Sequence, residues 1–389
     1  MISVAVIGAG NISAQHIEAY LAFPHRCKIT YLADIFPEKA EKRNNDYKIG
    51  AKINASHKDI LNAPDIDLVS VCTPPFCHAE IAVDFLNAGK NVLVEKPMAA
   101  SLQECDAMIE AAEKSGKTLS VIAQNRFRDP VYNLKKVLDA QLIGKIVHAQ
   151  VESFWWRAHC YYDLWWRGTW EKEGGGCTLN HAVHHIDMLC WMLGLPEKVS
   201  AVMSNAAHDN AEVEDISIAV LQYDGGLCAK GALAQVTSSV IHHGEEQQII
   251  FQGEKGRISW PWRAAAHTGQ PNGFPAKEQN TALVNQLNEY YENLPKLQYS
   301  LHAGQIDDVL SAIENTNKAG VKPMIGGRDG RNTIELITAI YKAGTEHRTI
   351  DLPVKKDDPF YTVSGMKEKV PRFYKKTVSV KELEGNITF

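Results

Sequence analysis

The chain has 389 residues, of which 45% are hydrophobic, 22% charged and 8% aromatic, and its formal net charge is -5. This composition excludes disordered, collagen-like and disulfide-stapled proteins, and a chain of this length needs no structural metal to fold. The 41 basic and 46 acidic residues form no long run of either sign, so nucleic acid is not expected as the main partner.

Short apolar runs alternate with helical patterns over the first 120 or so residues. We predict strands at 2–7, 29–33, 68–72, 91–94 and 118–123, with helices at 14–23, 38–45, 78–88 and 103–115 between them. Strands that are apolar throughout and separated by helices are typical of a parallel sheet covered on both faces. Residues 1–125 are therefore predicted to form a doubly wound α/β domain of the Rossmann type.

Longer alternating runs follow at 146–154, 198–203, 215–223, 227–238 and 247–252, with helices predicted at 182–193 and 281–293. This order is typical of an α+β domain with a large, mostly antiparallel open sheet and helices on one face. We assign residues 126–353 to this domain for substrate binding and oligomerisation, including helices at 305–318 and 330–345. Residues 354–389 form a charged extension with little periodicity, and its order is not predicted.

A glycine-rich turn joins the first predicted strand to the first helix. Gly8 allows a tight turn, Gly10 lets the backbone approach a pyrophosphate, and the helix N-terminus with Asn11 and Ile12 supplies amide donors. Ser13 stands where a third glycine or alanine is usual. These features predict a dinucleotide site, and a glycine turn without a ligand is the alternative.

Asp34 ends the second predicted strand, where a carboxylate can accept both ribose hydroxyls of adenosine. The same charge repels a 2′-phosphate, and the next residue is Ile35 rather than an arginine, so NAD is favoured over NADP. Lys39, Lys42 and Arg43 keep NADP open as the less favoured cofactor. A solvent-facing aspartate is the alternative for Asp34.

Further motifs extend this pattern along the chain: Thr73-Pro74-Pro75 with His78, Glu95-Lys96-Pro97, and Gly174-Gly175-Gly176 with His184 and Asp187. With Gly8-Ala9-Gly10, they resemble the glucose-fructose oxidoreductase and inositol dehydrogenase family (Gfo/Idh/MocA) over all but the C-terminal extension. The resemblance implies an NAD(P)-dependent oxidoreductase acting on CH–OH groups. The expected cofactor residues beyond the glycine turn and Asp34 are Thr73, Pro74, His78, Glu95, Lys96 and Gln124.

Lys96 lies at the carboxyl end of a predicted strand, where open α/β sheets bind ligands. A lysine there can hydrogen-bond a substrate hydroxyl and stabilise the alkoxide that develops as hydride leaves. The resemblance assigns this role to Lys96 and implies that the proline after it is often cis. Glu95 is expected to position Lys96 rather than to react, and a solvated surface lysine is the alternative.

Asn180 and His184 are four residues apart at the predicted start of a helix, so they should face the same direction. His184 occupies the position of the family's catalytic histidine, and a histidine suits proton transfer at neutral pH. Asn180 stands where many members carry aspartate. Because an amide cannot act as a base, His184 alone would serve as acid and base, with Asn180 orienting a hydroxyl or the lysine.

The histidines at 181, 184 and 185 do not predict a metal site, because neighbouring side chains diverge by about 100° around a helix. Asp187 is expected to cap or brace the site. No metal is expected.

Five of the eight tryptophans fall within residues 154–170, among arginine, histidine and tyrosine side chains. Aromatic faces stack on pyranose rings, and flanking polar groups bind hydroxyls, so this segment favours a carbohydrate. Such residues also build cores and subunit interfaces, which is the alternative. The expected substrate-binding residues are Arg126, Tyr162, Arg167, Trp170, Asn180, His181 and His184.

The leading hypothesis is an NAD(H)-dependent dehydrogenase or reductase acting on a secondary hydroxyl of a sugar, glycoside or cyclitol, with C3 as a candidate carbon. One alternative is a glycosidase that keeps NAD bound, oxidises C3 transiently and eliminates the aglycone. Another is a non-catalytic NAD-binding sensor, against which the presence of Lys96 and His184 weighs.

The first residues lack a basic region followed by an apolar leader, and no stretch approaches 18 uninterrupted apolar residues. The eight scattered cysteines contain no CxxC pair and fit a reducing cytosol. We therefore expect a cytoplasmic protein without a membrane partner. The resemblance implies a homodimer or homotetramer, since the open face of the antiparallel sheet needs cover.

Overall fold

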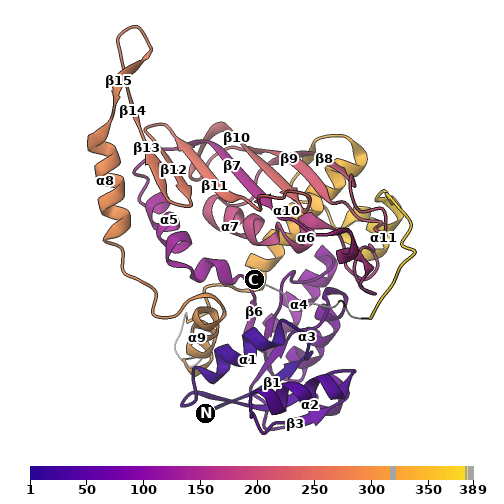
Figure 1. Cartoon of the computed structure of the whole chain (residues 1–389). Helices are drawn as coiled ribbons and strands as arrows, with labels where there is room; N and C mark the ends of the chain where they lie inside the picture. Colours follow the sequence, from indigo (N-terminus) through magenta and orange to yellow (C-terminus); the bar gives the residue numbers. More distant parts are fainter. Residues whose placement is uncertain (316–320, 382, 384–389) are drawn as a thin grey trace. The chain divides into compact units, whose positions relative to one another are not determined.

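The computed structural model describes residues 1–315, 321–381 and 383, and the chain divides into two compact units (Figure 1). The first unit contains residues 1–127, 298–334 and 361–363. The second contains residues 128–297 and 335–360 and the described residues from 364 onward.

The first unit is built on a six-stranded parallel sheet in the order β3-β2-β1-β4-β5-β6. The strands are β1 (Ile2–Ile7), β2 (Cys27–Ala33), β3 (Lys52–Asn54), β4 (Leu68–Val71), β5 (Asn91–Val94) and β6 (Leu119–Val121). Helices α1 (Ser13–Leu21), α2 (Pro37–Asp46), α3 (His78–Asn87) and α4 (Leu102–Ser115) lie between them in the sequence. The predicted doubly wound parallel sheet is confirmed, and β3 is an additional edge strand.

Helix α9 (Leu301–Glu314) also belongs to the first unit. Its apolar residues Ile306, Val309 and Leu310 are buried in the same core as Val4 and Ile17. The division predicted at residue 125 assigned this helix to the second domain, and the difference arises because its apolar face completes the core beside α1. Residues 316–318 of the helix predicted over 305–318 lie outside the described residues.

The second unit contains an eight-stranded sheet in the order β13-β12-β11-β7-β10-β9-β8-β16. All neighbouring strands are antiparallel except β7 and β10, which confirms a mostly antiparallel sheet. The strands are β7 (Ile146–Phe154), β8 (Lys198–Ser204), β9 (Ile216–Tyr223), β10 (Cys228–Ser239), β11 (Gln247–Gly253), β12 (Arg257–Trp260), β13 (Arg263–Ala265) and β16 (Ile350–Asp351). Strands β14 (His267–Gly269) and β15 (Pro275–Gln279) form a separate hairpin.

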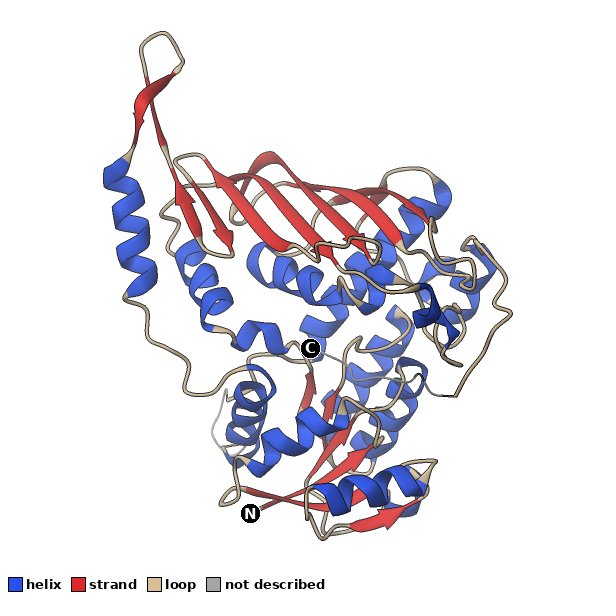
Figure 2. Cartoon of the chain, viewed as in Figure 1, coloured by secondary structure: helices blue, strands red, loops and turns tan. Residues whose placement is uncertain are grey.

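Helices cover one face of this sheet, as Figure 2 shows. They include α5 (Asp129–Asp139), α6 (Cys177–Asn180) and α7 (Val183–Leu193), which contact strands β12, β9, β10 and β7. Helix α8 (Thr281–Glu292) packs on α5, and α10 (Gly327–Glu346) is shared between the two units. Short 3-10 helices occur at His57–Ile60, Pro75–Cys77, Gln124–Phe127, His159–Asp163 and Pro359–Tyr361.

The C-terminal segment, whose order was not predicted, contains helix α11 (Val363–Lys369) and an extended stretch. The extended stretch pairs with the tryptophan-rich segment through a parallel bridge between Val380 and Leu164. Residues 382 and 384–389 of the predicted extension lie outside the described residues.

Among the residues that the structure describes, no helix is both long enough and apolar enough to cross a bilayer.

Candidate active site

The glycine turn between β1 and α1 has a shape that only small residues permit. Gly8 has a φ of +94°, and a Cβ there would lie 2.7 Å from the carbonyl oxygen of Cys72. A Cβ on Gly10 would meet no atom of the described residues within 4 Å, so the backbone beside the start of α1 is open. Ser13 is buried and its hydroxyl donates to the Gly10 carbonyl at 2.6 Å, which closes the turn. A phosphate can therefore approach the helix N-terminus here.

Asp34 lies at the end of β2 and contacts this turn. Its Oδ2 accepts the Ala9 N–H at 2.6 Å, and its Oδ1 accepts the Phe36 N–H at 2.8 Å. The half-buried carboxylate is thereby fixed next to the glycine turn, as binding of an adenosine ribose requires.

The three basic residues that kept NADP open have local contacts. The Arg43 guanidinium donates to the Gly10 carbonyl at 3.1 Å, and Lys42 pairs with Asp46 at 2.7 Å. Lys39 lies over the ring of Phe36.

Two of the predicted cofactor residues have a buried oxygen atom in the side chain. Thr73 Oγ1 and Gln124 Oε1 have no hydrogen-bond partner among the described residues. Because unpaired buried polar atoms are costly, such oxygens fit a bound polar ligand. Pro74 directly precedes the short helix Pro75–Cys77, Asn11 is exposed, and Ile12 is half-buried.

His78 is fully buried between two of the sequence motifs. Its Nδ1 lies 2.8 Å from the Pro97 carbonyl oxygen, and its Nε2 lies 2.8 Å from that of Thr73. Burial lowers the pKa of this imidazole. His78 therefore braces the backbone of two loops at the carboxyl edge of the parallel sheet.

Lys96 is half-buried just beyond the end of β5. Its peptide N–H donates to Glu95 Oε2 at 3.0 Å, and the Lys96–Pro97 peptide bond is cis. Arg126, predicted to bind substrate, is 1% exposed and its Nη1 lies 2.9 Å from Asp329 Oδ1.

The triple-glycine motif of the second unit is tightly enclosed. A Cβ on Gly175 would lie 2.1 Å from the Tyr341 hydroxyl, and one on Gly176 would lie 1.8 Å from the Glu214 carbonyl oxygen. The buried Glu214 carboxylate accepts the N–H groups of Gly176 and Thr178, both at 3.0 Å, and burial raises its pKa to about 7. Glu214 and Tyr341 therefore set the start of α6, and no local sequence pattern pointed to either.

Asn180 and His184 lie on successive helices rather than on one. Asn180 ends α6 and His184 is the second residue of α7, because residues 181 and 182 form an irregular link in which the Ala182 N–H reaches the Cys177 carbonyl. The Asn180 amide donates to the Gly175 carbonyl at 3.0 Å. An aspartate carboxylate could not make this hydrogen bond, which gives a structural reason for the amide.

His181 is in contact with two aromatic residues from the tryptophan-rich segment. The Tyr161 hydroxyl lies 3.3 Å from His181 Nε2, and the Trp155 ring lies 6.0 Å from the His181 ring. The Arg157 guanidinium lies over both aromatic rings. Trp155 and Tyr161 are half-buried and were not chosen from the sequence, although they flank the residues that were.

Tyr162 and Trp170, both predicted to contact substrate, are each only 1% exposed. Trp170 donates its indole N–H to the Pro371 carbonyl at 3.0 Å and packs edge-on against the Tyr341 ring. The structure thus places both side chains in the interior of the second unit.

Arg167 forms an ion pair with the buried Glu173 at 2.7 Å. Its guanidinium lies 4.2 Å from the ring centroids of both Tyr161 and Trp166. Arg167 therefore reaches the same aromatic ring as Arg157 does.

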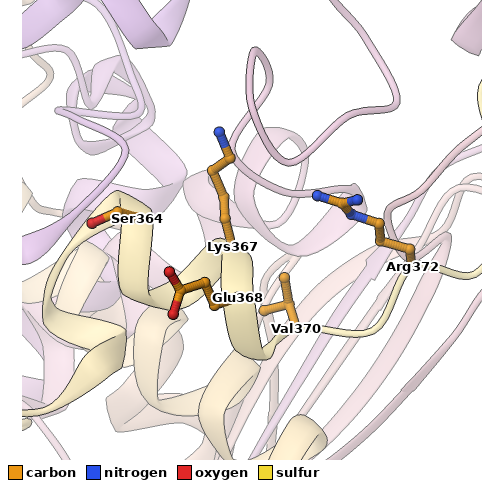
Figure 3. Close-up of a pocket in the computed structure, with 5 residues that line it drawn as sticks. All are labelled: Ser364, Lys367, Glu368, Val370 and Arg372. Atoms are coloured by element: carbon orange, nitrogen blue, oxygen red, sulfur yellow. The ribbon is translucent and has the colours of Figure 1, made fainter.

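A hollow of about 590 Å³ lies along α11 and the residues after it (Figure 3), and none of its lining residues was predicted as a site residue. Its lining is Ser364, Lys367, Glu368, Val370 and Arg372. The two basic side chains lie within ion-pair distance of Glu171 and Glu212, at 3.7 and 3.9 Å. Its charges are therefore balanced, and it offers no preference for an anion.

The parallel sheet, its glycine turn and the acidic residue at the end of β2 define an NAD-binding oxidoreductase. The family model described as "Oxidoreductase family, NAD-binding Rossmann fold" matches residues 2–123, and the "GFO/IDH/MocA C-terminal domain" matches residues 131–259. The chain belongs to the Gfo/Idh/MocA family.

Similar proteins include enzymes that act on sugars and cyclitols. Inositol 2-dehydrogenase/D-chiro-inositol 3-dehydrogenase of Shouchella clausii is 28% identical over 270 residues, which cover 67% of this chain and 72% of that protein. The WlbA dehydrogenase of Bordetella pertussis, solved with NADH and UDP-GlcNAcA, is 27% identical with a TM-score of 0.76, covering 91% of this chain and 98% of that one. Aldose-aldose oxidoreductase of Caulobacter crescentus, solved with glycerol, is 25% identical with a TM-score of 0.71, covering 90% and 99%.

Proposed function

We propose that this protein is an NAD(H)-dependent dehydrogenase that oxidises a secondary hydroxyl of a sugar, glycoside or cyclitol, or reduces the matching ketone. The observation that carries the proposal is the position of Lys96. This residue follows the carboxyl end of β5, and the glycine turn follows the carboxyl end of β1 in the same parallel sheet. Its backbone is fixed through the Lys96 N–H to the Glu95 carboxylate. A lysine in that place can stabilise an alkoxide oxygen.

His184 is proposed to move the hydroxyl proton, and Lys96 to hold the oxygen. NAD, when bound, supplies the acceptor for the hydride. Asn180 is proposed to orient a hydroxyl of the substrate or Lys96. C3 is the carbon that we propose for oxidation of a pyranose.

The carbohydrate class is supported by the aromatic residues around His181. Trp155 and Tyr161 lie beside it and are half-buried. Aromatic faces of this kind suit the apolar faces of pyranose rings. Tyr162 and Trp170, by contrast, are proposed to support the site from within.

We propose a homodimer or homotetramer, because one face of the eight-stranded sheet exposes apolar side chains among the described residues. A cytoplasmic location is proposed as well. Val202 and Ile218 are directly opposed on neighbouring strands and are 66% and 51% exposed, and Val220 follows on the same face. A patch of this kind typically marks an interface between proteins. Sedimentation as a monomer at micromolar concentration would contradict this part of the proposal.

The test is incubation of the purified protein with NAD and a panel of pyranoses, glycosides and cyclitols, with NADH followed by absorbance. We expect turnover on at least one of them, a loss of about a thousandfold in Lys96→Ala, and unchanged turnover in the exposed control Lys230→Ala. Turnover of Lys96→Ala equal to wild type would refute the proposed role. Release of an aglycone without net NADH would instead indicate the glycosidase reaction.

A further inference from the structure

A buried group of three ionisable side chains lies directly behind Lys96. His16 on α1, Glu95 after β5 and His302 on α9 are 0%, 3% and 8% exposed. They come from three segments far apart in the sequence, all within the first unit. The ligand-type atoms of the three side chains lie within 4.8 Å of one another.

The Glu95 carboxylate is the centre of this group. His16 Nε2 lies 2.8 Å from Glu95 Oε1, whereas His302 Nε2 lies 3.6 Å from the same oxygen. The other oxygen, Oε2, accepts the Lys96 N–H. The first contact has hydrogen-bond geometry and the second acts only through charge or dipole, so His16 should hold the carboxylate more strongly than His302 does.

The His16 ring has a second hydrogen-bonding contact, on the nitrogen that does not face Glu95. Its Nδ1 lies 2.7 Å from Ser70 Oγ, which also receives the Tyr20 hydroxyl at 3.2 Å. This chain of contacts fixes the plane of the imidazole. The orientation of the carboxylate, and with it the backbone of Lys96, therefore depends on side chains of α1 and β4.

These contacts offset the free-energy cost of burying the Glu95 carboxylate. Burial by itself raises a carboxyl pKa, yet the pKa of Glu95 is held well below its usual range by the hydrogen bond with His16 and by charge interaction with His16 and His302. The titratable groups facing Glu95 are His16, His302, Cys72, His78 and Lys96. Without a donor from His16, the carboxylate would be less stable in its anionic form.

We propose that His16 and His302 are positioning residues that act through the Glu95 carboxylate to hold Lys96 in the geometry that the reaction needs. This inference rests on the proposed role of Lys96. It goes beyond that role because it predicts that His16 and His302, which are not among the proposed catalytic residues, affect the catalytic rate.

The test compares His16→Leu with His16→Gln, whose amide nitrogen can replace Nε2 as the donor. We expect kcat of His16→Leu to fall about 10- to 100-fold, as displacement of a reacting group does, while KM for NAD and sugar changes less than about threefold. His16→Gln should recover most of the rate. His302→Leu should lose less than His16→Leu, because its contact is longer.

The pH profile supplies a readout that a loss of packing would not move. With its donor removed, the pKa of Glu95 should rise, so the acid limb of the kcat profile should move to higher pH in His16→Leu and stay in place in His16→Gln. A folded His16→Leu with unchanged kcat, or equal losses in the Leu and Gln variants, would overturn the inference.

A measurement without turnover separates this inference from the proposed function. In the protein without substrate, the rate at which an amine-reactive ester modifies Lys96 is measured by peptide mass spectrometry, with exposed Lys230 as reference. Loss of the anionic neighbour should speed modification of Lys96 about threefold or more in His16→Leu but not in His16→Gln. Equal rates in all three proteins, or an equivalent of zinc bound at the three side chains, would overturn the inference even if the dehydrogenase is active.

Discussion

The loop after β5 and the tryptophan-rich segment of residues 154–170 both carried functional predictions, and they differ in what decides their structure. Lys96 follows a buried parallel strand, and Glu95 beside it is part of the same unit's interior. The position of Lys96 is set by sheet topology, which a short motif indicates well. In the aromatic segment, contacts from residues about 200 positions later decide which rings are buried.

The consequence is clearest in the two tryptophans at the ends of the aromatic segment. Trp170 is held by Pro371 in the interior, whereas Trp155 lies next to His181. Composition identified the segment but could not distinguish these two rings. A strand-end motif therefore predicts the place of a residue in the fold directly, whereas an aromatic cluster predicts only a region.

Substitution in the triple-glycine motif should give the largest effect on stability. Gly176→Ala places a methyl group against the Glu214 backbone, so we expect a loss of about 4 kcal/mol or a failure to fold. Gly269→Ala, where a Cβ meets no described atom within 4 Å, should change stability by less than about 0.5 kcal/mol. Denaturant unfolding of the two variants provides the measurement, and similar stabilities would show that tertiary contacts do not explain this motif.

The next largest effect should be a pH dependence of the free energy of unfolding, caused by a buried histidine in the second unit. Burial lowers the pKa of His185 to about 4, and neither ring nitrogen has a hydrogen-bond partner among the described residues. His185 therefore binds a proton near pH 6.5 in the unfolded state but only near pH 4 in the folded state. Through this residue, the free energy of unfolding should fall by about 3 kcal/mol between pH 7 and pH 4.

His185→Leu should remove that pH dependence and leave the protein at least as stable at pH 7, because an unpaired buried imidazole is lost. The exposed control His267→Leu should keep it. Unfolding free energies measured at several pH values decide the matter, and a His185→Leu curve parallel to that of wild type would contradict the expectation.

Asn210 should give a smaller effect that tests the C-terminal contacts directly. Its side chain accepts the N–H groups of Thr377 and Val378 at 2.7 and 2.9 Å and donates to Asp163 at 2.7 Å. Asn210→Ala should cost about 2 kcal/mol and raise KM for the sugar, with the affinity for NADH unchanged.

Limited proteolysis after residue 370 should be faster in Asn210→Ala than in the exposed control Asn62→Ala. If both variants resist cleavage as wild type does and have the same KM, the C-terminal stretch does not support the aromatic segment.

Much of the fold could be predicted from the sequence because its strands are uniformly apolar or strictly alternating. β7 has the bounds predicted for it, and all five strands predicted in the first unit are present. Short edge strands such as β3 and β16 carry too few residues to show a period. The packing of α9 in the first unit had no local signal, since it depends on a distant apolar surface.

The candidate site likewise contains residues that the sequence indicates and residues that it does not. Lys96 and the glycine turn follow from local geometry, and Asp34 follows from its place at a strand end. Glu214 and His302 reach the site regions from remote segments, so spacing alone could not reveal them.

The most direct test of the central claim is the transfer of deuterium from a sugar deuterated at its ring carbons to NAD, read by mass spectrometry of the nucleotide. Wild-type protein should yield deuterated NADH from at least one sugar or cyclitol, and Lys96→Ala should yield about a thousandfold less per unit time. Tight binding of NADH without deuterium in the nucleotide for any substrate would contradict the assignment of a dehydrogenase.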